Sequence, residues 1–156
     1  METEDLLTRE NLAKIENYDQ FFELRQKVSS LGSVKLFELL FPISLQYELD
    51  GASAVAAMLL VEFDPKAMKS CEELLLDIAN SKWYFSDKLV PFYLVTQFGK
   101  YSLLNKIEEV LASRNISSEQ RTLLEGVKYW AVMPAASLSA QFTYFEWQEA
   151  IEGKNA

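Results

Sequence analysis

Any catalytic chemistry in this chain would have to rest on one cysteine, Cys71, and on carboxylates, because the sequence contains no histidine. Histidine is the commonest general base, the usual activator of serine and cysteine nucleophiles, and the commonest metal ligand. Its absence removes the Glu-x-x-His motif of di-iron helical proteins and the usual zinc sites. An active cysteine would need a lysine, a helix terminus or a carboxylate beside it.

Cys71 itself belongs to an apolar pattern. Met68, Cys71, Leu75 and Ile78 follow one another at three- and four-residue intervals, which places them on one face of a helix. Free cysteine is among the most often buried residue types, and only its thiolate is a nucleophile. We therefore predict that Cys71 packs in the core.

The carboxylates occur in helically spaced groups, Glu72, Glu73 and Asp77 in one segment and Glu108 and Glu109 in another. Glycosidase-type catalysis needs two carboxyl groups that face each other across a pocket, one of them with a raised pKa. Here the acids lie opposite the apolar stripes of their segments, so they belong to polar helix faces. We expect them to be solvated.

Cofactor signatures are missing as well. The five dispersed glycines form neither a G-x-G-x-x-G nor a G-x-x-x-x-G-K-[ST] phosphate loop, and there is no Ser-centred nucleophile elbow. A calcium loop carries acids at alternate positions around a glycine, and Glu48, Asp50 and Gly51 supply only a fragment of one. The sequence predicts no cofactor, no metal and no catalytic residue.

Charge is the feature that points to a partner. The 156 residues include 23 acidic and 15 basic side chains, a net charge of −8, which repels a phosphate backbone. Residues 1–64 hold twelve acids and five bases, whereas residues 65–156 hold eleven acids and ten bases. We expect a basic protein as partner and no nucleic acid, with the first two-fifths of the chain as the docking field.

Most of the chain carries helical patterns. One predicted helix starts at Asp64–Pro65 and ends near Asn80, and another runs from Phe21 to Leu31 with Gly32 as its C-terminal cap. Further patterns lie at 103–111, after the Ser117/Gln120 capping box, at 137–153, and at 89–98, which is apolar almost all round and closed by Gly99. The 89–98 helix should be central.

Residues 43–63 allow two interpretations. Apolar and polar residues alternate over 43–49, and Asp50–Gly51 supplies a turn, which is the pattern of a hairpin's first strand. The segment after the turn is rich in alanine, the best helix former and a poor strand former. We favour a helix from Ser53 to Phe63 and keep the hairpin as the alternative.

These patterns together predict an all-α protein, with residues 1–156 as a single domain built as a bundle or a short stack of antiparallel helix pairs. In helix spacing, residues 65–133 resemble HEAT-like helical repeats, and Pro91, early in a buried helix, adds to the similarity. Such repeats imply helix pairs stacked in order along the chain.

Localisation is expected to be cytoplasmic. Residues 1–5 are acidic, whereas a secretory or mitochondrial leader is basic, and a single cysteine allows no intrachain disulfide. The longest uncharged run, 129–145, is too short and too polar to span a membrane.

Partner-binding candidates are of two kinds, acids that would steer a basic partner and aromatic residues that would anchor it. Aromatic residues interrupt the helical patterns at 83–85 and recur at 144–147, and the alternative role for both runs is to pack between helices. The candidates are Glu10, Glu16, Asp19, Glu23, Glu48, Asp50, Glu62, Asp64, Trp83 and Tyr84.

By its profile as a small, acidic, helical and histidine-free chain, the sequence resembles the immunity proteins that bacteria pair with toxins. This resemblance implies a non-catalytic monomer or homodimer that covers the cationic site of a basic, nuclease-like toxin. The alternatives are a helical scaffold or adaptor subunit of a larger assembly and, third, an enzyme that uses Asp, Glu, Tyr or Lys alone.

Overall fold

The protein is all-α, as predicted. The computed structural model describes residues 2–113 and 115–134, and within them it has no β-strand. The helices of this part are the 3-10 helix η1 (Thr3–Leu7), α1 (Arg9–Leu12), α2 (Tyr18–Val28), α3 (Ser33–Ser44), α4 (Ala52–Phe63), α5 (Cys71–Ala79), α6 (Leu89–Phe98), α7 (Lys100–Leu111) and α8 (Ser118–Ala131).

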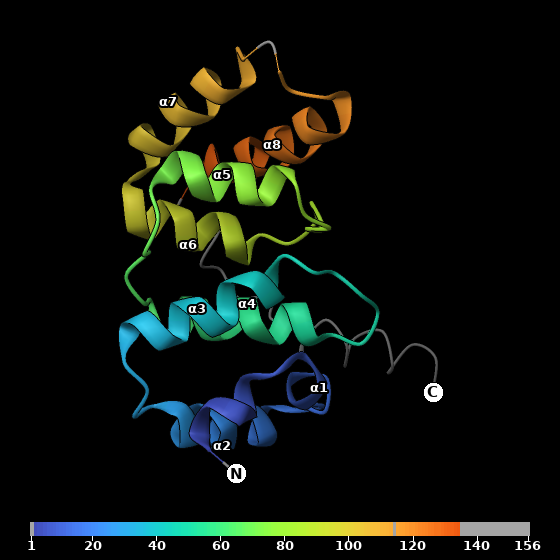
Figure 1. The fold of residues 1–156 in the computed structure, drawn as a ribbon, viewed down its shortest axis with the longest axis vertical. Coiled ribbons are helices and arrows are strands. Elements are labelled where there is room, and N and C mark those ends of the chain that lie inside the picture. Colours follow the sequence, from blue (N-terminus) through green and yellow to red (C-terminus); the bar gives the residue numbers. More distant parts are fainter. Residues whose placement is uncertain (1, 114, 135–156) are drawn as a thin grey trace.

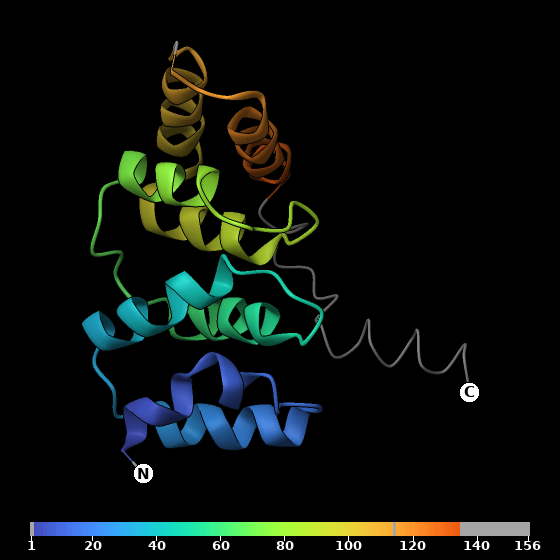
Figure 2. The same ribbon diagram turned by 45° about the vertical axis from the view of Figure 1, so that its right-hand side comes forward.

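The helices are stacked in layers that follow the order of the chain (Figures 1 and 2). The first layer holds η1, α1 and α2, and the next three are the pairs α3–α4, α5–α6 and α7–α8. Helix α4 packs against α1 on one side and α6 on the other, and α6 in turn packs against α7 and α8. The arrangement is the short stack of antiparallel helix pairs that the helical patterns predict.

Helix α4 lies at the middle of this stack because it has no polar face. Its first nine residues are buried except Ala54, and Ala56 and Ala57 are fully inaccessible. Alanine favours the helix and lets neighbouring helices approach closely. The helical interpretation of 53–63 is therefore confirmed. Helix α6, the predicted 89–98 helix, ends at Gly99 with φ 83°, also as expected.

The alternative of a hairpin strand at 43–49 is wrong. Ile43 and Ser44 form the last turn of α3, and the only ladder contact of this stretch in the described chain is an isolated parallel bridge between Gln46 and Lys82. A strand needs a partner along its length, and the segment after the turn is helical. The alternation buries no common face either, since Leu45 is buried whereas Leu49 is 93% exposed.

Two predicted helix ends are also wrong. Asp64 does not start a helix: it ends α4 in the left-handed region, and α5 starts at Cys71, behind a capping box of Ser70 and Glu73. Met68 therefore lies outside the helix and is exposed. Gly32 is not the cap of α2, which ends at Val28, but the residue before α3, with an ordinary φ of −70°.

The remaining local expectations fall into two groups. The stripe of 103–111 and the capping box of Ser117 and Gln120 are confirmed in α7 and α8. The predicted helix at 137–153 and the aromatic run at 144–147 lie outside the described residues.

One carboxylate ties the α5–α6 loop to the start of α6. Asp87 accepts hydrogen bonds from the backbone N–H groups of Leu89 (2.8 Å) and Val90 (3.4 Å) and from the indole Nε1–H of Trp83 (3.0 Å). Burial raises the pKa of Asp87, against the effect of these three donors. Removal of the side chain would leave a buried indole N–H and a helix N-terminus without an acceptor.

We therefore predict that Asp87→Ala lowers the free energy of unfolding by about 2–4 kcal/mol, measured by urea denaturation at pH 7. Asp77→Ala is the matched control, because Asp77 forms a surface ion pair with Lys69, and its removal should change stability by less than about 1 kcal/mol. Equal losses in the two variants would contradict the structural role of Asp87.

Candidate protein-binding surface

Five aromatic side chains form a continuous row where the loops of successive layers meet. We call this row, Tyr47, Tyr84, Phe85, Trp130 and Tyr129, the aromatic edge. The rings of Tyr47 and Tyr84 stack with centroids 4.5 Å apart, and Tyr84 and Phe85 are 5.5 Å apart. Trp130 donates its Nε1–H to the Phe85 carbonyl oxygen (2.7 Å), and Tyr129 packs edge-on against Trp130 at 5.1 Å.

The aromatic edge is accessible. Four of its side chains keep between 38% and 58% of their surface exposed, and Trp130 is half-buried. An exposed, connected apolar patch of this kind is typical of an interaction surface rather than of scattered surface residues. Aromatic residues also dominate the energetics of protein interfaces.

Three separate elements hold the aromatic edge in place. Tyr47 comes from the α3–α4 loop, and its backbone N–H donates to the Lys82 carbonyl oxygen (3.4 Å) beside Tyr84 in the α5–α6 loop. Helix α8 can approach the second loop because it has a glycine there: a Cβ at Gly126 would lie 3.0 Å from the Cβ of Phe85. Contacts from these three elements thus fix the positions of the rings.

Trp83 does not belong to this surface. It was predicted as an anchor, but it is only 3% exposed and packs against Gly126, with its indole N–H bound to Asp87. Only Tyr84 of the two predicted anchors reaches the surface. Side chains alternate in and out along an extended loop, which buries Trp83 and turns its neighbours Lys82 and Tyr84 outward.

Two of the predicted acids, Glu48 and Asp50, lie close to the aromatic edge, and a third, Glu10, belongs to a helix beside it. Arg9 of α1 reaches the α3–α4 loop and binds the Gln46 carbonyl oxygen (2.7 Å), Asp50 (3.0 Å) and Glu48 (3.4 Å). This contact places α1, including Glu10, beside the loop that carries Tyr47. Glu48 and Asp50 are thus held next to the aromatic edge by one guanidinium.

The other predicted acids are exposed but lie elsewhere. Glu16, Asp19 and Glu23 belong to the first layer, where Glu23 pairs with Lys27 and Glu62 of α4 pairs with Arg25. Asp64 accepts hydrogen bonds from Thr96 (2.9 Å) and Gln97 (2.7 Å), so it joins two layers. Asp50 and Asp64 flank opposite ends of the 12-residue helix α4, about 18 Å long. The eight acids therefore do not form a single patch.

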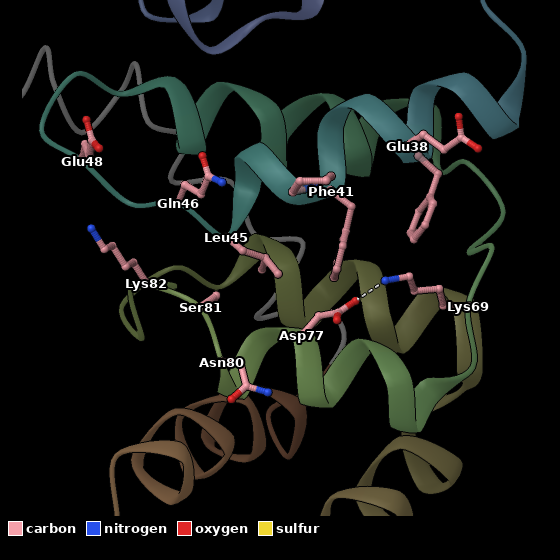
Figure 3. A pocket seen from close by; sticks show the side chains of 12 residues that line it. Glu38, Phe41, Leu45, Gln46, Glu48, Lys69, Asp77, Asn80, Ser81 and Lys82 are labelled. Atoms are coloured by element: carbon pink, nitrogen blue, oxygen red, sulfur yellow. Dashed lines mark hydrogen bonds and ion pairs between the residues drawn. The ribbon is translucent and has the colours of Figure 1, made fainter.

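A groove of about 670 Å³ runs between α3 and α5 (Figure 3). Phe41 of α3 and Leu45, directly after α3, point into it, and an ion pair between Lys69 and Asp77 (2.8 Å) lies opposite. Its mouth is lined by polar side chains at one end, namely Gln46, Glu48, Asn80, Ser81 and Lys82. The groove has one apolar and one polar wall, which suits a peptide side chain.

Of the carboxylates considered from the sequence as catalytic groups, Asp77 lines this groove, where it is paired with Lys69, and the others lie outside its lining. Glu73 caps α5, and the hydrogen bonds from Ser70 lower its pKa, the opposite of what a general acid needs. Glu108 and Glu109 form exposed ion pairs with Lys128 and Lys106. These positions agree with the prediction that the paired acids lie on solvated helix faces.

Sequence reasoning identified Tyr84 but missed Tyr47 and Tyr129 as its neighbours. Tyr47 belongs to an alternating pattern that is typical of a strand, and Tyr129 lies in an amphipathic helix whose apolar stripe contains Trp130. A tyrosine off the apolar stripe of an amphipathic helix was the available signal for Tyr129. Nothing local predicts that Tyr47 meets Tyr84, because they are brought together by layer stacking.

Comparison of the chain with family models, with curated protein sequences and with solved structures found no match. Among the described residues, no helix combines the length and apolarity needed to cross a membrane. The same residues contain no group of three or more Cys, Asp or Glu side chains placed to hold a metal ion.

Cys71 is half-buried at the first position of α5 and packs against the core. Burial raises the pKa of its thiol to about 11 and outweighs the opposite effect of Lys106. A thiol reagent at pH 8 should therefore react roughly 100-fold more slowly with the native protein than with the urea-unfolded chain, since only the thiolate reacts.

The pH profile checks this prediction further. The labelling rate of native Cys71 should still rise about tenfold per pH unit between pH 8 and 10, whereas the unfolded chain should level off near pH 9. A native profile that levels off below pH 9 would identify an activated thiol.

Proposed function

We propose that this is a non-catalytic, cytoplasmic protein that binds a basic protein partner, and that it acts as an immunity protein or inhibitor covering the cationic site of a nuclease-like toxin. The observation that carries the proposal is the aromatic edge, an exposed and ordered row of five rings with Glu48 and Asp50 beside it.

Preorganisation is the first support. The cost of ordering an interface side chain is about 0.5–1.5 kcal/mol, and it opposes binding. In the aromatic edge much of this ordering has already occurred, through ring stacking and the Trp130–Phe85 hydrogen bond. Less of the binding free energy of the rings is therefore spent on ordering them, so more of it contributes to affinity.

Charge is the second support. The acids of residues 1–64 are exposed at several places, and their joint potential attracts a basic partner before contact. Long-range steering depends on the summed charge, so it does not need the acids to be contiguous with the rings. Acids therefore govern the association rate, and the aromatic edge governs dissociation.

A helical scaffold or adaptor is the second candidate, favoured by apolar side chains that are exposed outside the aromatic edge, notably Tyr101 on α7 and Phe22 on α2. An adaptor would use several of these surfaces at once. Sedimentation velocity separates the candidates: an inhibitor is a monomer or dimer with one tight partner, and an adaptor self-associates or binds several proteins.

The immunity proposal predicts that the immobilised protein captures one basic protein from the cytoplasm of its own cells, identified by mass spectrometry. Tyr84→Ala should raise the dissociation rate of that complex roughly 30-fold, the effect of losing an interface hot spot of about 2 kcal/mol. Tyr101→Ala is the matched control, an exposed tyrosine outside the aromatic edge, and it should leave dissociation unchanged.

Salt tests the electrostatic part. Between 20 and 150 mM NaCl the association rate should fall several-fold while the dissociation rate changes little, because exposed charges are screened within about 8–10 Å near physiological ionic strength. An acidic partner, or an association rate indifferent to salt, would show that the charge of this chain serves only solubility.

A further inference from the structure

One exposed face of α2 has a composition of its own, separate from the aromatic edge. Asp19, Phe22, Glu23 and Gln26 of α2 and Ser29, its C-cap, recur at three- and four-residue spacing, so they form one stripe along the helix. Together with Arg25 and Phe63 they line a shallow hollow of about 570 Å³. Phe63 comes from the end of α4, so the hollow lies where α2 borders the second layer, and all five residues of the stripe are exposed.

Phe22 is the apolar centre of the stripe and is 47% exposed. Tyr18 stacks on its ring at 5.9 Å, and the guanidinium carbon of Arg25 lies 6.0 Å from the ring centroid. The ring thus already attracts one cation within its own helix. Its exposed part offers a contact for an apolar side chain flanked by cations.

Carboxylates lie on the same face on either side of this ring. Asp19 forms no ion pair with any described residue, and the bond of Glu23 with Lys27 (2.8 Å) is an exposed i,i+4 pair, which contributes little and exchanges easily. Asp19 and Glu23 are four residues apart, about 6 Å along the helix axis. Two cations at i and i+4 of a partner helix have the same spacing.

We propose that this face of α2 binds an amphipathic basic helix of the partner, with an apolar side chain on Phe22 and a lysine or arginine on each of Asp19 and Glu23. The inference rests on the proposed function, since it assigns a second contact to the same basic partner. Charge complementarity favours this occupant: Arg25 and Lys27 are each paired with a carboxylate, whereas Asp19 forms no ion pair with a described residue, so the face is net negative and disfavours an acidic segment or an anionic membrane.

The probe is a synthetic 14-residue helical peptide with lysines at i and i+4 spacing around a leucine, and it needs no knowledge of the native partner. Amide chemical shifts of the full-length protein should change along 19–29 when the peptide is added. Shifts concentrated on the aromatic edge or in the α3–α5 groove would overturn the proposal.

Two double variants that remove the same charge distinguish an effect at the α2 site from an effect of net charge. Asp19→Asn/Glu23→Gln should weaken peptide binding about tenfold, and Phe22→Ala should weaken it several-fold at unchanged salt dependence. Glu108→Gln/Glu109→Gln on α7 removes the same charge at the far end of the stack and should have little effect. Equal weakening by both double variants would overturn the proposal, and circular dichroism checks that each variant is folded.

The native complex distinguishes this inference from the proposed function. If Tyr84→Ala weakens the native complex and the α2 variants do not, the α2 site is wrong and the proposed function stands. If no basic partner is captured but the peptide binds at 19–29, the proposed function fails and the face remains a site for basic helices.

Discussion

Helix α4 is apolar on nearly every side, and most of the architecture follows from the need to bury its surface. Its alanines let α1, α3 and α6 approach closely, so the helix becomes a shared wall between the first layer and the third. Burial of apolar area is the dominant favourable contribution to folding. Elements that precede α4 in the chain cover one side of it and elements that follow it cover the other, so the layers are stacked in sequence order.

Layering also decides where the loops lie. The connections α3–α4 and α5–α6 emerge at the same edge of the stack, where the Gln46–Lys82 bridge joins them and Trp130 of the last layer closes on Phe85. Rings that are 37 residues apart in sequence, those of Tyr47 and Tyr84, thereby stack on each other. The aromatic edge is therefore a product of the fold.

Electrostatics and packing act over different distances in this molecule. Several carboxylates are used internally, as Asp50 is by Arg9 and Asp87 by the start of α6, and these hold loops in position. Others, such as Asp19, remain available to a partner. The electrostatic field of the dispersed acids extends over about one Debye length, roughly 8–10 Å, whereas aromatic rings interact only in van der Waals contact. In the proposed function, steering and anchoring therefore need not lie on the same layer.

The sequence alone determined several of the helices, because periodicity, capping boxes and alanine content act within a few residues: it predicted α6 to α8, and the helical nature of 53–63, correctly, but not η1, α1 or α3. It placed Asp64 and Gly32 wrongly, since either residue type suits both a start and an end of a helix. Only the tertiary structure decided that Trp83 is buried and Tyr84 exposed. The physical reason is that burial in a loop depends on what packs against it, here Gly126 of α8, 43 residues further along the chain.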